Sequence, residues 1–193
     1  MTSRRLLVVD VETSGLRPAD VVVECSWWDL TTDDRGTFIP RHNVRWVLDN
    51  GQPEALDLNG YRDRLARARQ DNGSEVARLH TALRGQRLAG ANPAFDARHL
   101  ERLFRVSGLY PDPWHHRLAD ITNLTAGALD IDPEGDLPGL SACCDLWGVP
   151  SGDHTAAGDV EATGRCFLAL AQFRASRKSA AMSAPTSTEG AAA

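Results

Sequence analysis

The chain has 193 residues, of which 42% are hydrophobic and 24% charged, so its length fits one soluble domain with an ordinary core better than two domains. The formal net charge of −5 argues against a protein that holds long duplexes by charge alone, but it leaves contact with a strand end open. No N-terminal apolar run is long enough for a membrane span or a secretory signal, so we expect a cytoplasmic protein that does not enter a membrane. The four cysteines form no C-x-x-C pair and are expected to be small buried thiols.

The N-terminal part of the chain has the composition of β-strands. Two runs are rich in Leu, Val and Trp, and both are bounded by residues that favour turns. We predict a buried strand over residues 5–11, followed by a turn at residues 14–15, and a second strand over residues 21–30. A hairpin-like turn is predicted at residues 33–36, and a third strand is predicted to start at residues 38–39. Residues 40–58 show no readable pattern.

The rest of the chain alternates helices with short strands. Apolar residues with helical spacing predict helices over residues 74–83, 95–106, 140–147 and 155–173. Ser74 is expected to cap the first of these helices. Residues 87–91 predict a short strand, and residues 118–129 predict a short strand followed by a helix. This order predicts an α/β domain with a mixed sheet.

The end of the chain differs in composition from the rest. Residues 174–193 consist mainly of Ala, Ser, Thr and Gly and contain almost no large apolar side chain. Such a segment buries too little surface to order itself. We therefore predict a domain over residues 1–173 and a flexible tail over residues 174–193.

The first candidate functional motif is Asp10-Val11-Glu12-Thr13 at the end of the first predicted strand. Residues i and i+2 of a strand point to the same face, so Asp10 and Glu12 are expected to lie side by side. Two adjacent carboxylates resist joint ionisation, and a divalent cation between them removes that cost. A strand end that simply meets solvent is an equally good interpretation of this motif alone.

The second and third motifs each place an acid near the start of a helix. In Asn92-Pro-Ala-Phe-Asp96, the acid belongs to the first turn, where a carboxylate is favoured by the helix dipole alone. In His154-Thr-Ala-Ala-Gly-Asp159, the acid is expected more than one turn into the last helix, where Asp has poor propensity. His154 precedes that helix, so a loop could bring it to the same place, although an isolated loop histidine is usually just solvated.

Together, these motifs resemble the DEDDh, or DnaQ-like, 3′–5′ exonucleases. That family includes the proofreading exonucleases of DNA polymerases, ribonuclease T and oligoribonuclease. The matching stretches are residues 10–16, 92–100 and 140–163. The resemblance implies an RNase H-like fold with a mixed five-stranded sheet flanked by helices.

The resemblance also implies roles for individual residues. Asp10 would bridge two Mg²⁺ or Mn²⁺ ions, with Glu12 and Asp159 completing the first metal site and Asp96 holding the second ion through water. His154 would be the general base, because histidines commonly titrate near neutrality. Thr13 and Leu16 would contact the 3′-terminal nucleotide, although a capping hydroxyl and a core leucine are alternative interpretations.

The resemblance implies hydrolysis of phosphodiester bonds from the 3′ end of a single strand, with release of nucleoside monophosphates. DNA is favoured over RNA, and a polymerase or repair protein is the partner to expect. An exoribonuclease of the ribonuclease T or oligoribonuclease type and an inactive nucleic-acid or polymerase-binding module are the alternatives. A phosphatase is disfavoured because Glu12 stands where its motif has a second Asp. Many family members have His before the Asn of the second motif, where this chain has Ala91.

Overall fold

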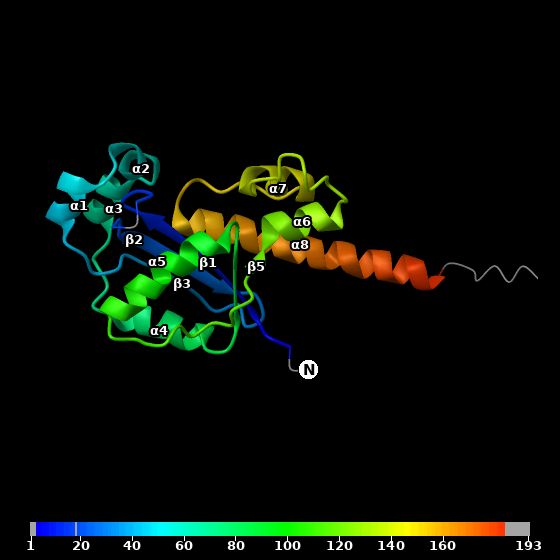
Figure 1. Cartoon of the computed structure of the whole chain (residues 1–193), viewed down its shortest axis with the longest axis horizontal. Coiled ribbons are helices and arrows are strands. Elements are labelled where there is room, and N and C mark those ends of the chain that lie inside the picture. The colour runs from blue at the N-terminus through cyan, green and yellow to red at the C-terminus, as the bar shows by residue number, and fades with distance from the viewer. Residues whose placement is uncertain (1–2, 18, 184–193) are drawn as a thin grey trace, which may run out of the picture.

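The fold is organised around a mixed five-stranded sheet. We analysed a computed structural model that describes residues 3–17 and 19–183. The strands of the described residues are β1 (Leu6–Thr13), β2 (Val22–Asp29), β3 (Arg35–Phe38), β4 (Arg87–Gly90) and β5 (Ala119–Asp120). They lie in the order β3-β2-β1-β4-β5 (Figure 1). β2 runs antiparallel to β1 and β3, whereas β4 runs parallel to β1 and β5.

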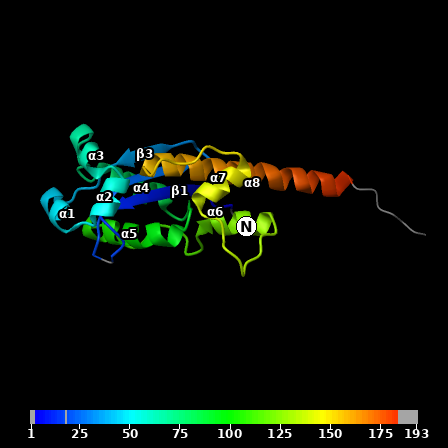
Figure 2. The same cartoon turned by 90° about the horizontal axis from the view of Figure 1, so that it is seen from above.

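Helices cover both faces of this sheet. They are α1 (Val44–Asn50), α2 (Pro53–Leu58), α3 (Tyr61–Arg67), α4 (Ser74–Leu83), α5 (Pro93–Val106), α6 (Ile121–Ala128), α7 (Leu140–Trp147) and α8 (Ala156–Ser183). α4 and α5 contribute to the core on one face, and α6, α7 and α8 contribute to the core on the other. Figure 2 shows α5 and α8 on opposite sides of β1.

β1 divides its side chains between these two cores. Leu7 and Val9 belong to the core under α4 and α5, whereas Val8 belongs to the core under α8. This alternation follows from the two-residue period of a strand. By the same period, Asp10 and Glu12 share the side of Val8 and therefore point toward α8.

Small residues permit close packing between α8 and the sheet. A Cβ atom added at Gly164 would lie 2.3 Å from the ring of Trp28 in β2. The cysteines are all buried and free, as predicted, and Cys144 and Cys166 bring their sulfur atoms to 3.8 Å between α7 and α8. Among the described residues, no helix has both the length and the apolar character that a bilayer crossing requires.

The predicted elements are largely confirmed, and the differences lie at their ends. The turn between β2 and β3 lies at residues 30–32, ahead of the predicted 33–36, so Arg35 and Gly36 already belong to β3. Phe38 ends that strand, where we predicted a beginning. Ser74 begins α4 but does not cap it; the carboxylate of Asp71 accepts hydrogen bonds from the first backbone N–H groups instead.

α8 is longer than predicted. It continues through Ser183, ten residues into the predicted tail, and its residues 174–180 are exposed. Extending an existing helix needs no new nucleus, and Ala, Arg, Lys and Met are good helix formers, so this stretch can stay helical without burying surface. Residues 174–183 are thus helical where we expected a segment that does not order itself, and residues 184–193 of the predicted flexible tail lie outside the described part of the chain.

Candidate active site

Three acidic side chains meet at the end of β1. Asp10 and Glu12 project from the strand, and Asp159 projects from α8, which packs on the same side of the sheet. Each offers a carboxylate oxygen, and these three oxygens all lie within 4.8 Å of one another. Oxygen ligands at such spacing suit a hard divalent cation. The structure thus brings together three of the four predicted acids from segments nearly 150 residues apart in the sequence.

Asp96, the fourth acid, approaches the same strand from α5. Its side chain is buried, with 3% of the residue exposed, and accepts a hydrogen bond of 3.0 Å from the Val11 backbone N–H. Asp96 begins its helix as predicted, after Asn92 in a left-handed conformation and Pro93 at the first helical position. It does not belong to the group of three oxygens, but its charge acts on Asp10.

Asp159 lies in the first turn of α8, so its predicted place deeper in the helix is wrong. The helix begins at Ala156, one residue later than predicted, and therefore leaves Asp159 near its N-terminus. Its carboxylate turns back against the preceding loop, where a Cβ atom added at Gly152 would lie 1.8 Å from Oδ1. Only a residue without a side chain fits there while the carboxylate keeps this position.

The electrostatics of the group oppose full ionisation. Burial, and then the charges of Asp96, Glu12 and Asp159, raise the pKa of Asp10 well above its usual range. Burial raises the pKa of Glu12 to about 7 against the opposing charge of Arg64. Burial also raises the pKa of Asp96 to about 7, although the Val11 N–H favours its ionised form. A cation would relieve this repulsion, so the donor set fits a divalent metal.

His154 lies beside Asp159 in the loop before α8. The residue is exposed and adopts a left-handed backbone with φ of 60°. Burial raises the pKa of Asp159, whereas the backbone of His154 and the charge of its ring both lower it. The charge of the imidazole therefore acts on the Asp159 carboxylate, while the residue itself is exposed.

The two predicted substrate contacts lie in the turn after β1. Thr13 is buried, and its hydroxyl donates a hydrogen bond of 2.7 Å to the Gly15 carbonyl. Leu16 is 77% exposed, so the alternative of a core leucine is wrong. Its backbone N–H donates to Oε1 of Gln52, which fixes the turn while the side chain points to solvent.

Sequence reasoning missed an ion pair next to the acids. Glu24 lies opposite Glu12 in the β1–β2 pair and forms an ion pair with Arg64 of α3. The Glu24 carboxylate also accepts a hydrogen bond of 2.9 Å from the Ala156 backbone N–H, at the first residue of α8. An acid in the middle of the apolar run of β2 was the available signal, because a buried charge needs a partner.

With this geometry, the chain can be compared with known proteins. No family model and no curated protein matches the sequence. An exonuclease I structure, described for how it achieves processivity, has a TM-score of 0.68 at 21% identity and covers 91% of this chain and 42% of that one. Product-bound exonuclease I has a TM-score of 0.65 at 22% identity, and the match covers 93% of this chain and 45% of that one. The zinc-bound complex of E. coli exonuclease I with single-stranded DNA has a TM-score of 0.67 at 21% identity, and the match covers 91% of this chain and 42% of that one.

The fold is RNase H-like. The predicted fold class is thus confirmed by the sheet topology and by these structures together. The chain spans less than half the length of these exonuclease I chains. At this identity, the similarity establishes the fold, and the acidic group at the end of β1 is independent evidence for a metal centre.

Proposed function

We propose that this protein is a metal-dependent 3′–5′ exonuclease that hydrolyses single-stranded DNA from its 3′ end and releases nucleoside monophosphates. The observation that carries this proposal is that carboxylate oxygens of Asp10, Glu12 and Asp159 lie close enough together to bind one metal ion. The resemblance of the sequence motifs and the similarity of the fold to exonuclease I support the same reaction.

The acids would hold two Mg²⁺ or Mn²⁺ ions. Asp10, Glu12 and Asp159 would form the first set of ligands, and Asp96 of α5 would contribute to the second ion. Bound divalent ions supply an acidic water and charge neutralisation at the leaving oxygen. The raised pKa values of Asp10 and Glu12 support this assignment, because carboxylates placed at a cost to their own ionisation are typical of functional sites.

The remaining residues would act on water and on the strand. His154 would take the proton of the attacking water and pass it to solvent, to which the residue is exposed, while the leaving 3′ oxygen takes a proton from solvent. The exposed side chain of Leu16 packs against the 3′-terminal nucleotide, and Thr13 holds the turn that presents it.

The substrate and partner are proposed from the neighbouring structures. Exonuclease I has been solved with single-stranded DNA and with an oligonucleotide, which favours DNA over RNA for this chain. It has also been solved as a complex with the C-terminus of SSB, so we propose a single-strand-binding or other repair protein as partner.

The decisive experiment is a cleavage assay on 5′-labelled single-stranded DNA, single-stranded RNA and short oligoribonucleotides. We expect a ladder of products shortened from the 3′ end with Mg²⁺ or Mn²⁺ and no products with a chelator. Asp10→Ala and Asp159→Ala should abolish cleavage and keep the circular dichroism spectrum of the native protein. Faster cleavage of RNA would assign the exoribonuclease alternative, whereas full activity of either variant would refute the site.

A further inference from the structure

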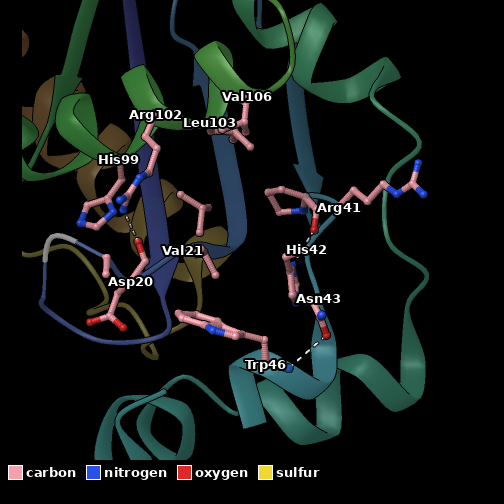
Figure 3. A pocket seen from close by; sticks show the side chains of 13 residues that line it. Asp20, Val21, Arg41, His42, Asn43, Trp46, His99, Arg102, Leu103 and Val106 are labelled. Carbon is pink, nitrogen blue, oxygen red and sulfur yellow. Dashed lines mark hydrogen bonds between the residues drawn. The ribbon is translucent and has the colours of Figure 1, made fainter. Parts of the chain in front are cut away.

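A cavity beside α5 lies outside the acidic group. It has a volume of about 370 Å³ and is enclosed by α5, the start of β2 and the segment before and within α1 (Figure 3). Trp46 borders one part of it, whereas His99 and Arg102 border another. Residues 40–46, which gave no readable pattern in the sequence, thus form one wall of a cavity.

A second depression adjoins this cavity and reaches the turn after β1. Its volume is about 200 Å³, and its lining includes Leu16 and Phe95, which neighbour the acids in sequence. It shares His99 and Arg102 with the large cavity. The two depressions therefore form one path along α5, which we name the α5 groove and define by Leu16, Phe95, Arg98, His99, Arg102 and Trp46.

Flat rings line the α5 groove. Trp46 is 38% exposed although it is a large apolar side chain. The His99 ring packs on Phe95 with 4.6 Å between centroids. In the cavity wall, the His42 ring lies within 2.7 Å of the Pro40 carbonyl and 2.6 Å of the Tyr61 hydroxyl, which hold its orientation. Burial lowers the pKa of both histidines, which favours the uncharged form of these rings.

Cations follow the same path. Arg98 and Arg102 project from α5, and Arg102 donates a hydrogen bond of 3.2 Å to the Asp20 carbonyl. The acid in the lining is Asp20, whose carboxylate is buried and paired with Arg17 at 3.0 Å. Arg41 also lines the cavity but carries its guanidinium away from it (Figure 3). The groove thus combines positive charge with aromatic surface in a protein whose net charge is −5.

We propose that the α5 groove binds the nucleotides upstream of the 3′ end of a single strand, with a base stacked on Trp46 and the phosphates beside Arg98 and Arg102. Sequence-tolerant binding of single strands relies on this combination of aromatic faces and a cationic track. From Phe95 to Val106, α5 runs for about 16 Å, enough for about five nucleotides at stacked spacing. The inference rests on the proposed exonuclease function, since that function places the 3′ end at Leu16.

The test compares strands of different length in groove variants. Trp46→Ala removes the stacking surface, and Arg102→Gln removes a charge while it keeps a donor for the Asp20 carbonyl. Binding of labelled oligothymidylate in chelator, followed by fluorescence anisotropy, should weaken about fivefold or more in Trp46→Ala. Arg102→Gln should lower the slope of log affinity against log salt by about 0.7. In both variants, the ratio of kcat/KM for a long strand to kcat/KM for a dinucleotide should fall.

Matched controls lie on the same helices. Leu48 of α1 has the same exposed fraction as Trp46, 38%, and Arg105 of α5 pairs with Glu101 away from the groove. Leu48→Ala and Arg105→Gln should keep the native binding and the native length ratio. Groove variants that match these controls would overturn the inference and leave the exonuclease proposal intact. Binding that depends on Trp46 without hydrolysis of any strand would overturn the exonuclease proposal and keep the groove.

Discussion

Gly152 is the residue whose missing side chain leaves room for the Asp159 carboxylate. In Gly152→Ala, the new methyl group would overlap Oδ1 of Asp159 and push the carboxylate away from Asp10 and Glu12. The fold should survive, because the two atoms closest to the new methyl group are Oδ1 and Cγ of the Asp159 side chain. A misplaced catalytic group can cost about a hundredfold in rate, and we expect a loss of that order in single-turnover hydrolysis of a labelled strand.

A suitable control for Gly152→Ala is Gly127→Ala in α6. A Cβ atom at Gly127 would meet no heavy atom within 4 Å, so this variant should keep the native rate and melt at or above the native temperature. If Gly152→Ala hydrolysed strands as fast as Gly127→Ala, the position of Asp159 would not matter for the reaction.

The exposed imidazole of His154 allows a test of the general base. His154→Ala should reduce kcat by about a hundredfold or more while strand affinity stays near the native value. Because His154 has a positive φ, His154→Asn is the better-matched variant, since Asn tolerates this conformation but cannot accept the proton. Native turnover in both variants, measured at saturating metal, would assign the proton to another group.

At the scale of elements, one ion pair joins three segments around the acids. Arg64 brings α3 against β2 through Glu24, and the same carboxylate holds the first N–H of α8. Both side chains are largely buried, with 16% and 8% exposed, so each charge depends on the other. The pair therefore fixes where α8, and with it Asp159, begins.

Arg64→Met tests this arrangement, because it leaves the Glu24 carboxylate buried without its cation. We expect a loss of about 3 kcal/mol in the free energy of unfolding and a melting temperature lower by about 6–12 °C. The exposed Arg67 of the same helix provides the control, and Arg67→Met should change stability by less than about 0.5 kcal/mol. Equal melting temperatures for the two variants would show that the pair does not hold α8.

At the scale of the whole molecule, the acidic group couples stability to pH and metal. The pKa of Glu12 rises from its ordinary value of 4.5 to about 7, and that of Asp96 rises from 3.8 to about 7. Between the ordinary and the raised pKa of each group, these carboxylates hold more protons in the folded protein than in the unfolded chain. Their contribution to stability therefore falls as pH rises. Without metal, the melting temperature should therefore fall by several degrees between about pH 6.5 and about pH 8, above the range in which the lowered pKa values of His42 and His99 make stability rise with pH.

Divalent cations should reverse this fall, because they replace the bound protons. Stabilisation by Mg²⁺ or Mn²⁺ should be larger at about pH 8 than at about pH 5. Acids with lowered pKa values, such as Asp71 and Asp153, contribute stability that is lost only at lower pH, so they do not mask this window. A double variant, Asp10→Asn with Glu12→Gln, should lose the metal dependence and keep only the part of the pH dependence that comes from burial of Asp96. A melting temperature in chelator that rises across the window would contradict these pKa shifts.

The sequence predicted much of the fold and the acids of the site, because both are expressed in local patterns. The alternation within β1 placed Asp10 and Glu12 on one face, and helical spacing located α4, α5 and α7. The sequence could not show where α8 ends, because an exposed helical extension lacks the regular spacing of apolar residues that indicates a buried helix. Nor could it show that Leu16 is exposed, since its environment depends on Gln52, 36 residues away.

What the sequence alone determined is the chemistry: which acids are present, and which of them share a strand face. The tertiary structure decided which acids meet, because α8 and β1 are distant in the chain and become neighbours only through packing on the sheet. It also decided the Glu24–Arg64 pair and the α5 groove, whose walls come from segments without a common motif. The spacing of apolar residues indicates which face of a single segment is buried. A site formed by several segments exists only after the sheet has brought those segments together.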